Sequence, residues 1–162
     1  NCYVNAIEDS RIEFDCLYGP AYKGIFLGSI VATIFSQRGN SYPLSFNRKE
    51  IKDHGEGGNI IGADPVGNVL IIDDVLSAGT AARESIKILE SLNSTPKIFL
   101  VGLDRQEKGN GNLSAKKELE NDFGIQVSSI INLDALIKYS QNNQSFHSYV
   151  VELEGYRSNW GA

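Results

Sequence analysis

The segment at residues 69–81 constrains the fold of this chain most strongly, because it joins an apolar run to a polar turn and then to a helix. The apolar residues 69–72 are followed by two adjacent carboxylates, Asp73 and Asp74. A loop of small residues comes next, and helical spacing begins directly after it. A continuous apolar run bounded by turn residues is typical of a buried strand. The segment therefore predicts a strand–loop–helix unit with its polar groups at the carboxyl end of that strand.

Strand and helix patterns alternate along the chain. Strand patterns occupy residues 12–18, 43–46, 69–75, 97–103 and 126–133. Helical patterns occupy residues 3–7, 24–36 and 113–123, and others begin at Thr80 or Ala81 (with an apolar stripe of Ala82, Ile86, Leu89 and Leu92), at Asp134 and near Gln144. This alternation predicts an α/β fold with a mainly parallel sheet and helices on both of its faces. We expect residues 1–162 to form one domain.

The loop at residues 77–81 has the composition of a phosphate site. Small residues let a ligand approach the backbone closely, and the N–H groups at the start of a helix attract an anion. The hydroxyls of Ser77 and Thr80 add further donors, while Asp73 and Asp74 are suited to accept hydrogen bonds from sugar hydroxyls or to reach a metal through water. The alternative is an ordinary turn in which Thr80 is the N-cap of the helix. The combination of loop and carboxylates favours a sugar phosphate as ligand.

A second polar segment, residues 47–58, gathers positive charge in an otherwise acidic chain of net charge −5. Its cations are Arg48, Lys49, Lys52 and His54, and glycines stand at positions 55, 57 and 58. A movable cationic loop can stabilise a leaving group whose negative charge grows during reaction, and can exclude water. The alternative is a solvated run of surface charge.

Composition excludes several classes of protein. The acidic balance argues against a nucleic-acid partner, and no apolar run approaches the ~20 residues of a membrane span. The two cysteines, Cys2 and Cys16, give no disulfide framework, which fits a reducing compartment. Cys16 lies in an apolar run, so we expect it to be buried. We therefore expect a cytoplasmic protein without nucleic-acid or membrane partners.

Four segments together resemble one family of enzymes. VLIIDDVLSAGTA at residues 69–81 resembles the phosphoribosyl-pyrophosphate (PRPP) signature of the type I phosphoribosyltransferases. FDCLYGPAYKGI at 14–25, FNRKEIKDHGEGG at 46–58 and LDRQE at 103–107 resemble segments of the orotate phosphoribosyltransferases. The resemblance implies a Rossmann-like parallel sheet flanked by helices. It also implies transfer of ribose 5-phosphate from PRPP to orotate, which gives orotidine 5′-monophosphate and pyrophosphate in pyrimidine (UMP) biosynthesis.

The resemblance also implies a role for each matching residue. The residues expected to bind PRPP are Tyr22, Lys23, Arg48, Lys49, Lys52, His54, Asp73, Asp74, Val75, Leu76, Ser77, Ala78, Gly79, Thr80 and Ala81. The residues expected to act in catalysis are Lys49, Lys52, His54, Asp73 and Asp74. Orotate would contact Ser77 and Arg105, whose guanidinium fork suits a carboxylate. The implied cofactor, Mg²⁺, would be held mainly by PRPP, with water linking it to Asp73 or Asp74.

The implied assembly is a homodimer in which the loop at residues 48–58 reaches the neighbouring subunit's site. Family members also carry an N-terminal segment that forms a hood over the base. That hood is absent from this sequence, and we expect the native protein to have it. Two other functions remain open, a phosphoribosyltransferase for another base and a PRPP-binding regulator without catalytic activity.

Overall fold

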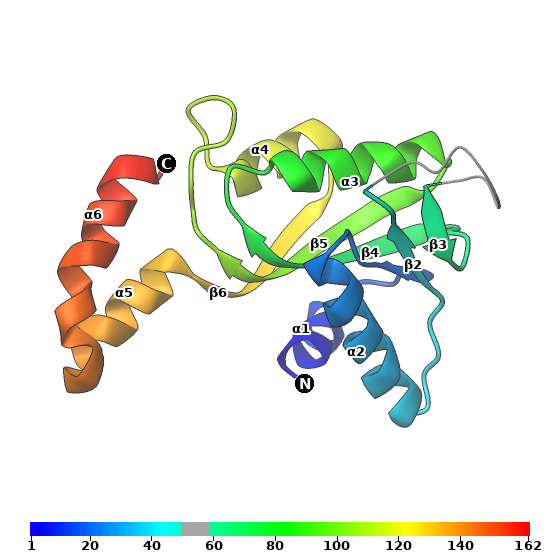
Figure 1. The fold of residues 1–162 in the computed structure, drawn as a ribbon, viewed down its shortest axis with the longest axis horizontal. Coiled ribbons are helices and arrows are strands. Elements are labelled where there is room, and N and C mark those ends of the chain that lie inside the picture. Colours follow the sequence, from blue (N-terminus) through cyan, green and yellow to red (C-terminus); the bar gives the residue numbers. More distant parts are fainter. Residues whose placement is uncertain (50–58) are drawn as a thin grey trace.

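The computed structural model describes residues 1–49 and 59–162 (Figure 1). The helices are α1 (Cys2–Ser10), α2 (Lys23–Gln37), α3 (Thr80–Ser91), α4 (Ala115–Phe123), α5 (Leu133–Asn142), the 3-10 helix η1 (Gln144–Tyr149) and α6 (Val150–Trp160). The strands are β1 (Cys16–Tyr18), β2 (Leu44–Asn47), β3 (Ile60–Gly62), β4 (Asn68–Leu76), β5 (Thr95–Asp104) and β6 (Gln126–Asn132). Strands and helices thus alternate along most of the chain, as predicted.

The six strands form one sheet in the order β3-β2-β1-β4-β5-β6. Pairing is parallel from β2 through β1, β4 and β5 to β6, and β3 alone among the described strands is antiparallel to its neighbour β2. The predicted mainly parallel sheet is therefore confirmed. The sequence analysis missed β3, which has only three residues and pairs at the edge of the sheet.

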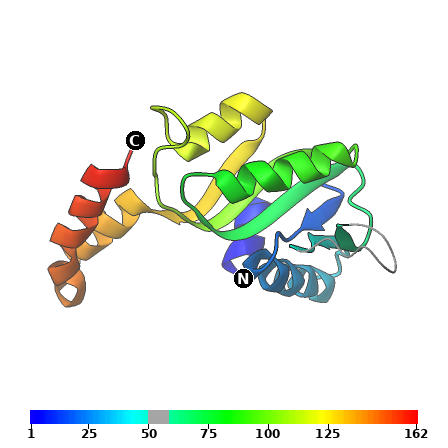
Figure 2. The same ribbon diagram turned by 45° about the horizontal axis from the view of Figure 1, so that its top comes forward.

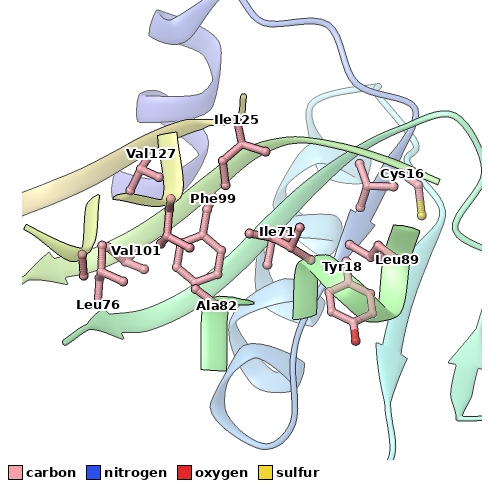
Figure 3. Packing of buried hydrophobic residues seen from close by; sticks show 14 residues of the cluster. Cys16, Tyr18, Ile71, Leu76, Ala82, Leu89, Phe99, Val101, Ile125 and Val127 are labelled. Carbon is pink, nitrogen blue, oxygen red and sulfur yellow. The ribbon is translucent and has the colours of Figure 1, made fainter. Parts of the chain in front are cut away.

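Alternate residues of β4 point to opposite faces of the sheet, and each face has its own core. Val69 and Ile71 pack with side chains of α3 and α4, as Figure 3 shows for this cluster. Leu70 and Ile72 pack with side chains of α1 and α2. Figures 1 and 2 show these two helical layers on either side of the sheet. The continuous apolar run of β4 is explained by burial on both faces.

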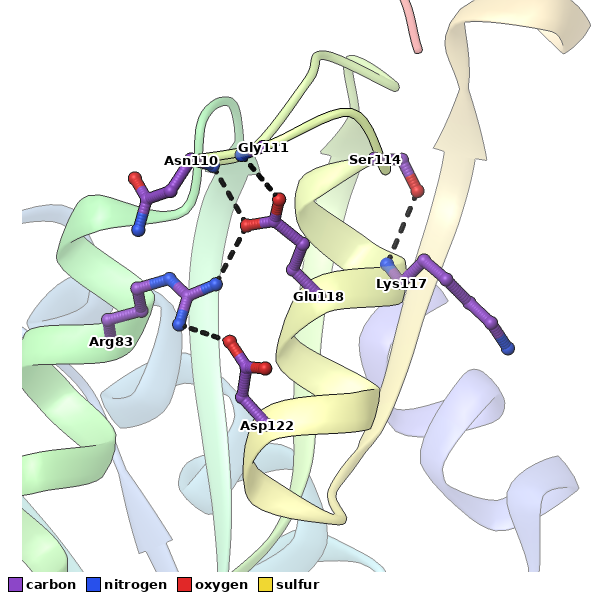
Figure 4. A network of polar contacts seen from close by, with 7 residues as sticks. All are labelled: Arg83, Asn110, Gly111, Ser114, Lys117, Glu118 and Asp122. Carbon is purple, nitrogen blue, oxygen red and sulfur yellow. Dashed lines mark hydrogen bonds and ion pairs between the residues drawn. The ribbon is translucent and has the colours of Figure 1, made fainter.

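A polar network joins α3, α4 and the loop after β5 (Figure 4). Arg83 on α3 donates to Glu118 over 2.8 Å and to Asp122 over 2.7 Å. The Glu118 carboxylate also accepts backbone N–H groups from Asn110 at 2.8 Å and Gly111 at 2.7 Å. These backbone hydrogen bonds, with the Arg83 guanidinium, lower the pKa of Glu118. The network holds α3 and α4 in one orientation behind the loop that connects β4 to α3.

Some predicted boundaries differ from the structure. The strand pattern at 12–18 forms a paired strand only from Cys16, which is buried as expected. Helix α3 begins at Thr80, as predicted, but ends at Ser91. Leu92 is therefore not part of the buried stripe, and it is 45% exposed. The predicted apolar stripe continues one residue past the end of the helix.

Helices α5 and α6 extend away from the sheet beyond β6 (Figure 2). The end of α6 nevertheless returns to the loop after β5, because the Lys108 N–H donates to the Trp160 carbonyl over 2.9 Å. His147 lies exposed on η1, and Trp160 is 59% exposed. Among the helices of the described residues, none combines the length and apolar character needed to cross a membrane.

The packing of α4 against the sheet can be tested at Leu119, because the Leu119 side chain is fully buried in the same core as Ile71. We expect Leu119→Ala to lower the free energy of unfolding by about 2–5 kcal/mol, because the substitution leaves a cavity. Leu113→Ala is the matched control at a leucine that is 48% exposed, and it should change stability by less than about 0.5 kcal/mol. Urea denaturation measures both, and equal losses would contradict the assignment of Leu119 to the core.

Candidate active site

The loop between β4 and α3 has a backbone that only glycine adopts easily. Gly79 precedes α3 with a φ of 87°, in the left-handed region. A β-carbon at this position would also come within 3.3 Å of the Ala115 Cβ on α4. Gly79, rather than Thr80, is the N-cap of α3, and no side chain caps this end of the helix in the described structure. The first N–H groups of α3 are thus left without a side-chain cap where a ligand would meet them.

A cavity of about 210 Å³ opens at this loop. It is lined by Asp73, Val75, Leu76, Ser77, Gly79, Thr80, Ala81, Ala82 and Phe99. Seven of these nine residues are ones that the sequence predicted to bind PRPP. The loop therefore gathers a carboxylate, two hydroxyls and the amino end of a helix around one cavity. Hydroxyl and amide donors with a positive helix end suit a phosphate, and a neighbouring carboxylate suits a hydroxyl.

Asp73 is a partly buried carboxylate at the end of β4. Its Oδ1 accepts the Asp74 backbone N–H over 2.9 Å, and its carbonyl accepts the Tyr3 hydroxyl of α1 over 2.9 Å. Burial, together with the neighbouring Asp74 carboxylate, raises the pKa of Asp73 to about 6. Ionised Asp73 is therefore short of partners in this structure and would gain from a hydrogen-bond donor supplied by a ligand.

Asp74 is paired with Lys23, which lies in the first turn of α2. The Lys23 Nζ is 2.6 Å from the Asp74 Oδ2, and the hydrogen bond to Asp74 raises the pKa of Lys23. The Lys23 side chain is 74% exposed. An exposed ion pair of this kind contributes little to stability, so a ligand can separate it at small cost. The structure thus brings together Lys23 and Asp74, which are 51 positions apart in the sequence.

The described part of the cationic segment lies beside the loop after β1. The Lys49 ammonium is 5.0 Å from the centre of the Tyr22 ring. Arg48 and Lys49 also line a cavity of about 650 Å³ together with Ala81 in the first turn of α3. These four predicted residues therefore share one side of the carboxyl edge of the sheet. Lys52 and His54 lie outside the described residues.

Arg105 follows β5 directly, and its backbone N–H donates to the Leu76 carbonyl over 2.9 Å. This bond places Arg105 next to Ser77, the other residue expected to contact the base. The Arg105 Nε lies 3.0 Å from the Glu107 Oε1, and the guanidinium carbon lies 4.9 Å from the centre of the Tyr156 ring. Parallel pairing of β4 with β5 thus joins the predicted phosphate loop to the predicted base-binding arginine.

Sequence reasoning missed four residues that support this site. Tyr3 donates to Asp73 from 70 positions away, and Asn47 accepts the Ala21 N–H of the loop after β1 over 2.9 Å. Glu107 and Tyr156 hold Arg105. Asn47 and Glu107 gave a local signal, because they stand in the quoted segments at 46–58 and 103–107. Tyr3 and Tyr156 stand in none of the quoted segments and act through contacts that depend on the folded chain.

The raised pKa of Asp73 predicts a change of stability with pH. Between about pH 4 and pH 6 the native state binds more protons at Asp73 than the unfolded chain does, so stability is lost as pH rises through this window. Asp73→Asn removes that loss because the amide has no charge to desolvate. We expect the variant to melt about 2–4 °C above the wild type at pH 7.5, with no gain near pH 4. Thermal unfolding at both pH values measures this, and an equal gain at both would exclude the burial of charge as its cause.

Comparison with known proteins gives sequence relatives of high similarity. No protein-family model matches the chain. An orotate phosphoribosyltransferase of Marinobacter nauticus is 50% identical over 159 residues, which cover 98% of this chain and 75% of that protein. An orotate phosphoribosyltransferase of Neisseria meningitidis is 47% identical with the same coverage.

Solved structures agree with the sequence relatives. The crystal structure of orotate phosphoribosyltransferase from Francisella tularensis matches with a TM-score of 0.81 and 33% identity, over 99% of this chain and 77% of that one. The UMP synthase of Leishmania donovani matches with a TM-score of 0.74 at 22% identity, over 98% of this chain and 32% of that one, which shows a shared fold. The expected fold is therefore confirmed, and the chain belongs to the orotate phosphoribosyltransferase family.

Proposed function

We propose that this protein transfers ribose 5-phosphate from PRPP to orotate and releases orotidine 5′-monophosphate and pyrophosphate. The observation that carries the proposal is the meeting of three groups at one edge of the sheet. These are the aspartates of β4, the loop before α3 and the arginine after β5. Each group has the chemistry of one part of the substrates, namely the ribose hydroxyls, the 5′-phosphate and the orotate carboxylate. The family membership of the chain supports the same reaction.

PRPP would bind along β4 and the loop that follows it. The N–H groups and hydroxyls from Ser77 to Ala81 would hold the 5′-phosphate, with the positive end of α3 behind them. Asp73 and Asp74 would accept hydrogen bonds from the two ribose hydroxyls. Binding separates Lys23 from Asp74, which frees the ammonium to contact the pyrophosphate beside Tyr22. Binding of PRPP would thus replace the ion pair of Asp74 with Lys23 by a hydrogen bond from a ribose hydroxyl to Asp74.

The base would lie on the β5 side of the same cavity. Arg105 would pair with the orotate carboxylate, because a guanidinium matches two carboxylate oxygens in one plane. Ser77 lies directly after Leu76, whose carbonyl holds Arg105, and would contact the base as well. A base without a carboxylate would offer Arg105 no anionic partner beyond Glu107. This arrangement favours orotate over the other bases considered above.

The departing pyrophosphate would be stabilised by cations of the segment that begins at Arg48 and Lys49. Lys52 and His54 would belong to the same group. In a homodimer this segment would serve the neighbouring subunit's site, and the two active sites would then be shared. Departure of pyrophosphate leaves positive charge on the ribose ring, and the orotate nitrogen attacks the opposite face of C1. Positioning and electrostatic stabilisation would supply most of the acceleration.

The residues present fit a Mg²⁺ ion held together with substrate. Within the described residues no group of three or more potential metal ligands forms a site made of protein alone. Asp73 and Asp74 do offer carboxylate oxygens, and Mg²⁺ is commonly bound by one or two carboxylates plus substrate phosphates. When bound, the ion would lower the negative charge of the leaving pyrophosphate.

A substitution of Lys49 tests both the proposed reaction and the role of the cationic segment in that reaction. We expect the wild type to consume orotate only when PRPP and Mg²⁺ are present. We expect Lys49→Ala to lower kcat by about 100-fold, with a much smaller change in the KM for PRPP, because its charge acts on the leaving group. Lys97→Ala is the control, since Lys97 lies at the amino end of β5, on the opposite edge of the sheet. A spectrophotometric orotate assay measures all three proteins.

No PRPP-dependent loss of orotate in the wild type would refute the reaction. PRPP binding without turnover would instead support the regulator considered above. Unchanged kcat in Lys49→Ala would leave the reaction standing and remove Lys49 from it.

Sharing of the sites can be tested by subunit mixing. Lys49→Ala and Asp74→Asn are each expected to have little activity alone. In a mixed dimer, one site combines the intact Asp74 of one subunit with the intact Lys49 of the other. An equimolar mixture should therefore regain about one quarter of wild-type activity when subunits assort at random in a two-fold dimer. No recovery after exchange has been verified by mass spectrometry would show that each subunit uses its own lysine.

A further inference from the structure

The contacts around Arg105 extend the base site to the last helix of the chain. We propose that Glu107 and Tyr156 are positioning residues that fix the Arg105 guanidinium for an incoming carboxylate. The inference rests on the proposed function, because it concerns how the same arginine recognises orotate. Neither residue is expected to touch substrate. Their effect would pass through the orientation of Arg105.

The first contact is the ion pair between Arg105 and Glu107. The Arg105 Nε lies 3.0 Å from the Glu107 Oε1. The Glu107 side chain is only 12% exposed, whereas that of Arg105 is 40% exposed. A carboxylate so removed from water needs partners, and the guanidinium supplies one. Glu107 is thus the more restrained member of the pair, and Arg105 is the member that can reach a ligand.

The second contact is the stacking of Arg105 on Tyr156 of α6. The guanidinium carbon lies 4.9 Å from the centre of the ring. The Tyr156 hydroxyl in turn donates to the same Glu107 Oε1 that pairs with Arg105. Burial, together with this Glu107 contact, raises the pKa of Tyr156. The three side chains therefore form a closed set in which each one restrains the other two.

This arrangement decides which part of Arg105 is left for a ligand. Glu107 contacts Nε, and the guanidinium carbon lies over the tyrosine ring. The ion pair with Glu107 is formed by Nε rather than by Nη1 or Nη2. The two terminal nitrogens form the end of the fork, which can hold both oxygens of one carboxylate. A restrained fork binds more tightly than a mobile one, since less side-chain entropy is lost on binding.

The backbone keeps the supporting residues in place. Arg105 is anchored to β4 through the Leu76 carbonyl. Gln106 has a φ of 53°, and its N–H donates to the buried Asp104 carboxylate over 2.8 Å. The Ala162 N–H donates to the Gln106 carbonyl over 3.2 Å, and a β-bridge joins Glu107 to Gly161. The C-terminal end of α6 is thereby fastened beside Arg105, which explains how a helix outside the sheet can reach the base site.

Glu107→Gln separates positioning from net charge. The variant keeps the shape of the side chain but removes a negative charge close to the carboxylate site. If net charge alone governed binding, orotate would bind better to the variant. If Glu107 positions Arg105, the weaker hydrogen bond to a neutral amide should loosen the guanidinium, and we expect the KM for orotate to rise about tenfold. The KM for PRPP and the melting temperature should change little.

Variants of Tyr156 and a double mutant with Arg105→Ala show whether the effect of Glu107 passes through Arg105. Tyr156→Leu removes the stacking ring and should resemble Glu107→Gln, whereas Tyr156→Phe keeps the ring and should have a smaller effect. In an Arg105→Ala background, Glu107→Gln should cause no further loss, because its effect passes through the arginine. Arg157→Gln is the matched control. It breaks the 3.2 Å ion pair of α6 with Asp134, directly after Tyr156 in the chain, and leaves the contacts of Arg105 with Glu107 and Tyr156 in place.

Steady-state kinetics for both substrates, together with thermal unfolding, decide the outcome. An unchanged or lowered KM for orotate in Glu107→Gln would overturn the inference. So would a rise no greater than that of Arg157→Gln, or an equal rise for PRPP accompanied by a lower melting temperature, which indicates a purely structural role. Failure of the proposed function is distinguishable, because the wild type itself would then not convert orotate.

Discussion

Burial of β4 on both faces is the constraint on which the rest of this structure depends. The strand lies at the centre of the sheet, with one core above it and another below. The sequence of β4 must therefore be apolar until the strand nears its carboxyl end, and polar side chains can begin only there. Asp73 stands at that boundary, where burial raises its pKa to about 6. The position that makes this carboxylate unfavourable in the free protein also makes it receptive to a hydroxyl donor.

The parts of the fold that the sequence predicted are those determined by local patterns. The apolar run of β4, the helix that begins at Thr80 and the alternation of strands and helices each arise from neighbouring residues. Seven of the motif residues between Asp73 and Ala81 could be placed around one cavity because a strand, a turn and a helix follow one another directly. Strand β3 was missed for the opposite reason. It has three residues, and it exists through pairing with β2 rather than through a pattern of its own.

The parts of the site that could not be predicted depend on contacts between distant segments. Tyr3 reaches the Asp73 carbonyl from α1, and Tyr156 reaches Arg105 from α6. Neither tyrosine stands in a motif, and tyrosines at helical spacing are ordinary packing residues. Glu107 stands in a motif, but its spacing from Arg105 gives no direction to the side chain. The left-handed backbone conformation of Gln106 and the β-bridge between Glu107 and Gly161 supply that direction.

The two ends of the described chain thus support opposite sides of one site. Helix α1 holds the backbone of the aspartate pair, and α6 holds the arginine after β5. Strand pairing alone would align β4 with β5, but the side chain of Arg105 would still sample many rotamers. A rigid sheet edge therefore suffices for the phosphate, which backbone N–H groups can bind. Recognition of a planar carboxylate needs an oriented guanidinium. The contact of α6 with Arg105 at the sheet supplies that orientation.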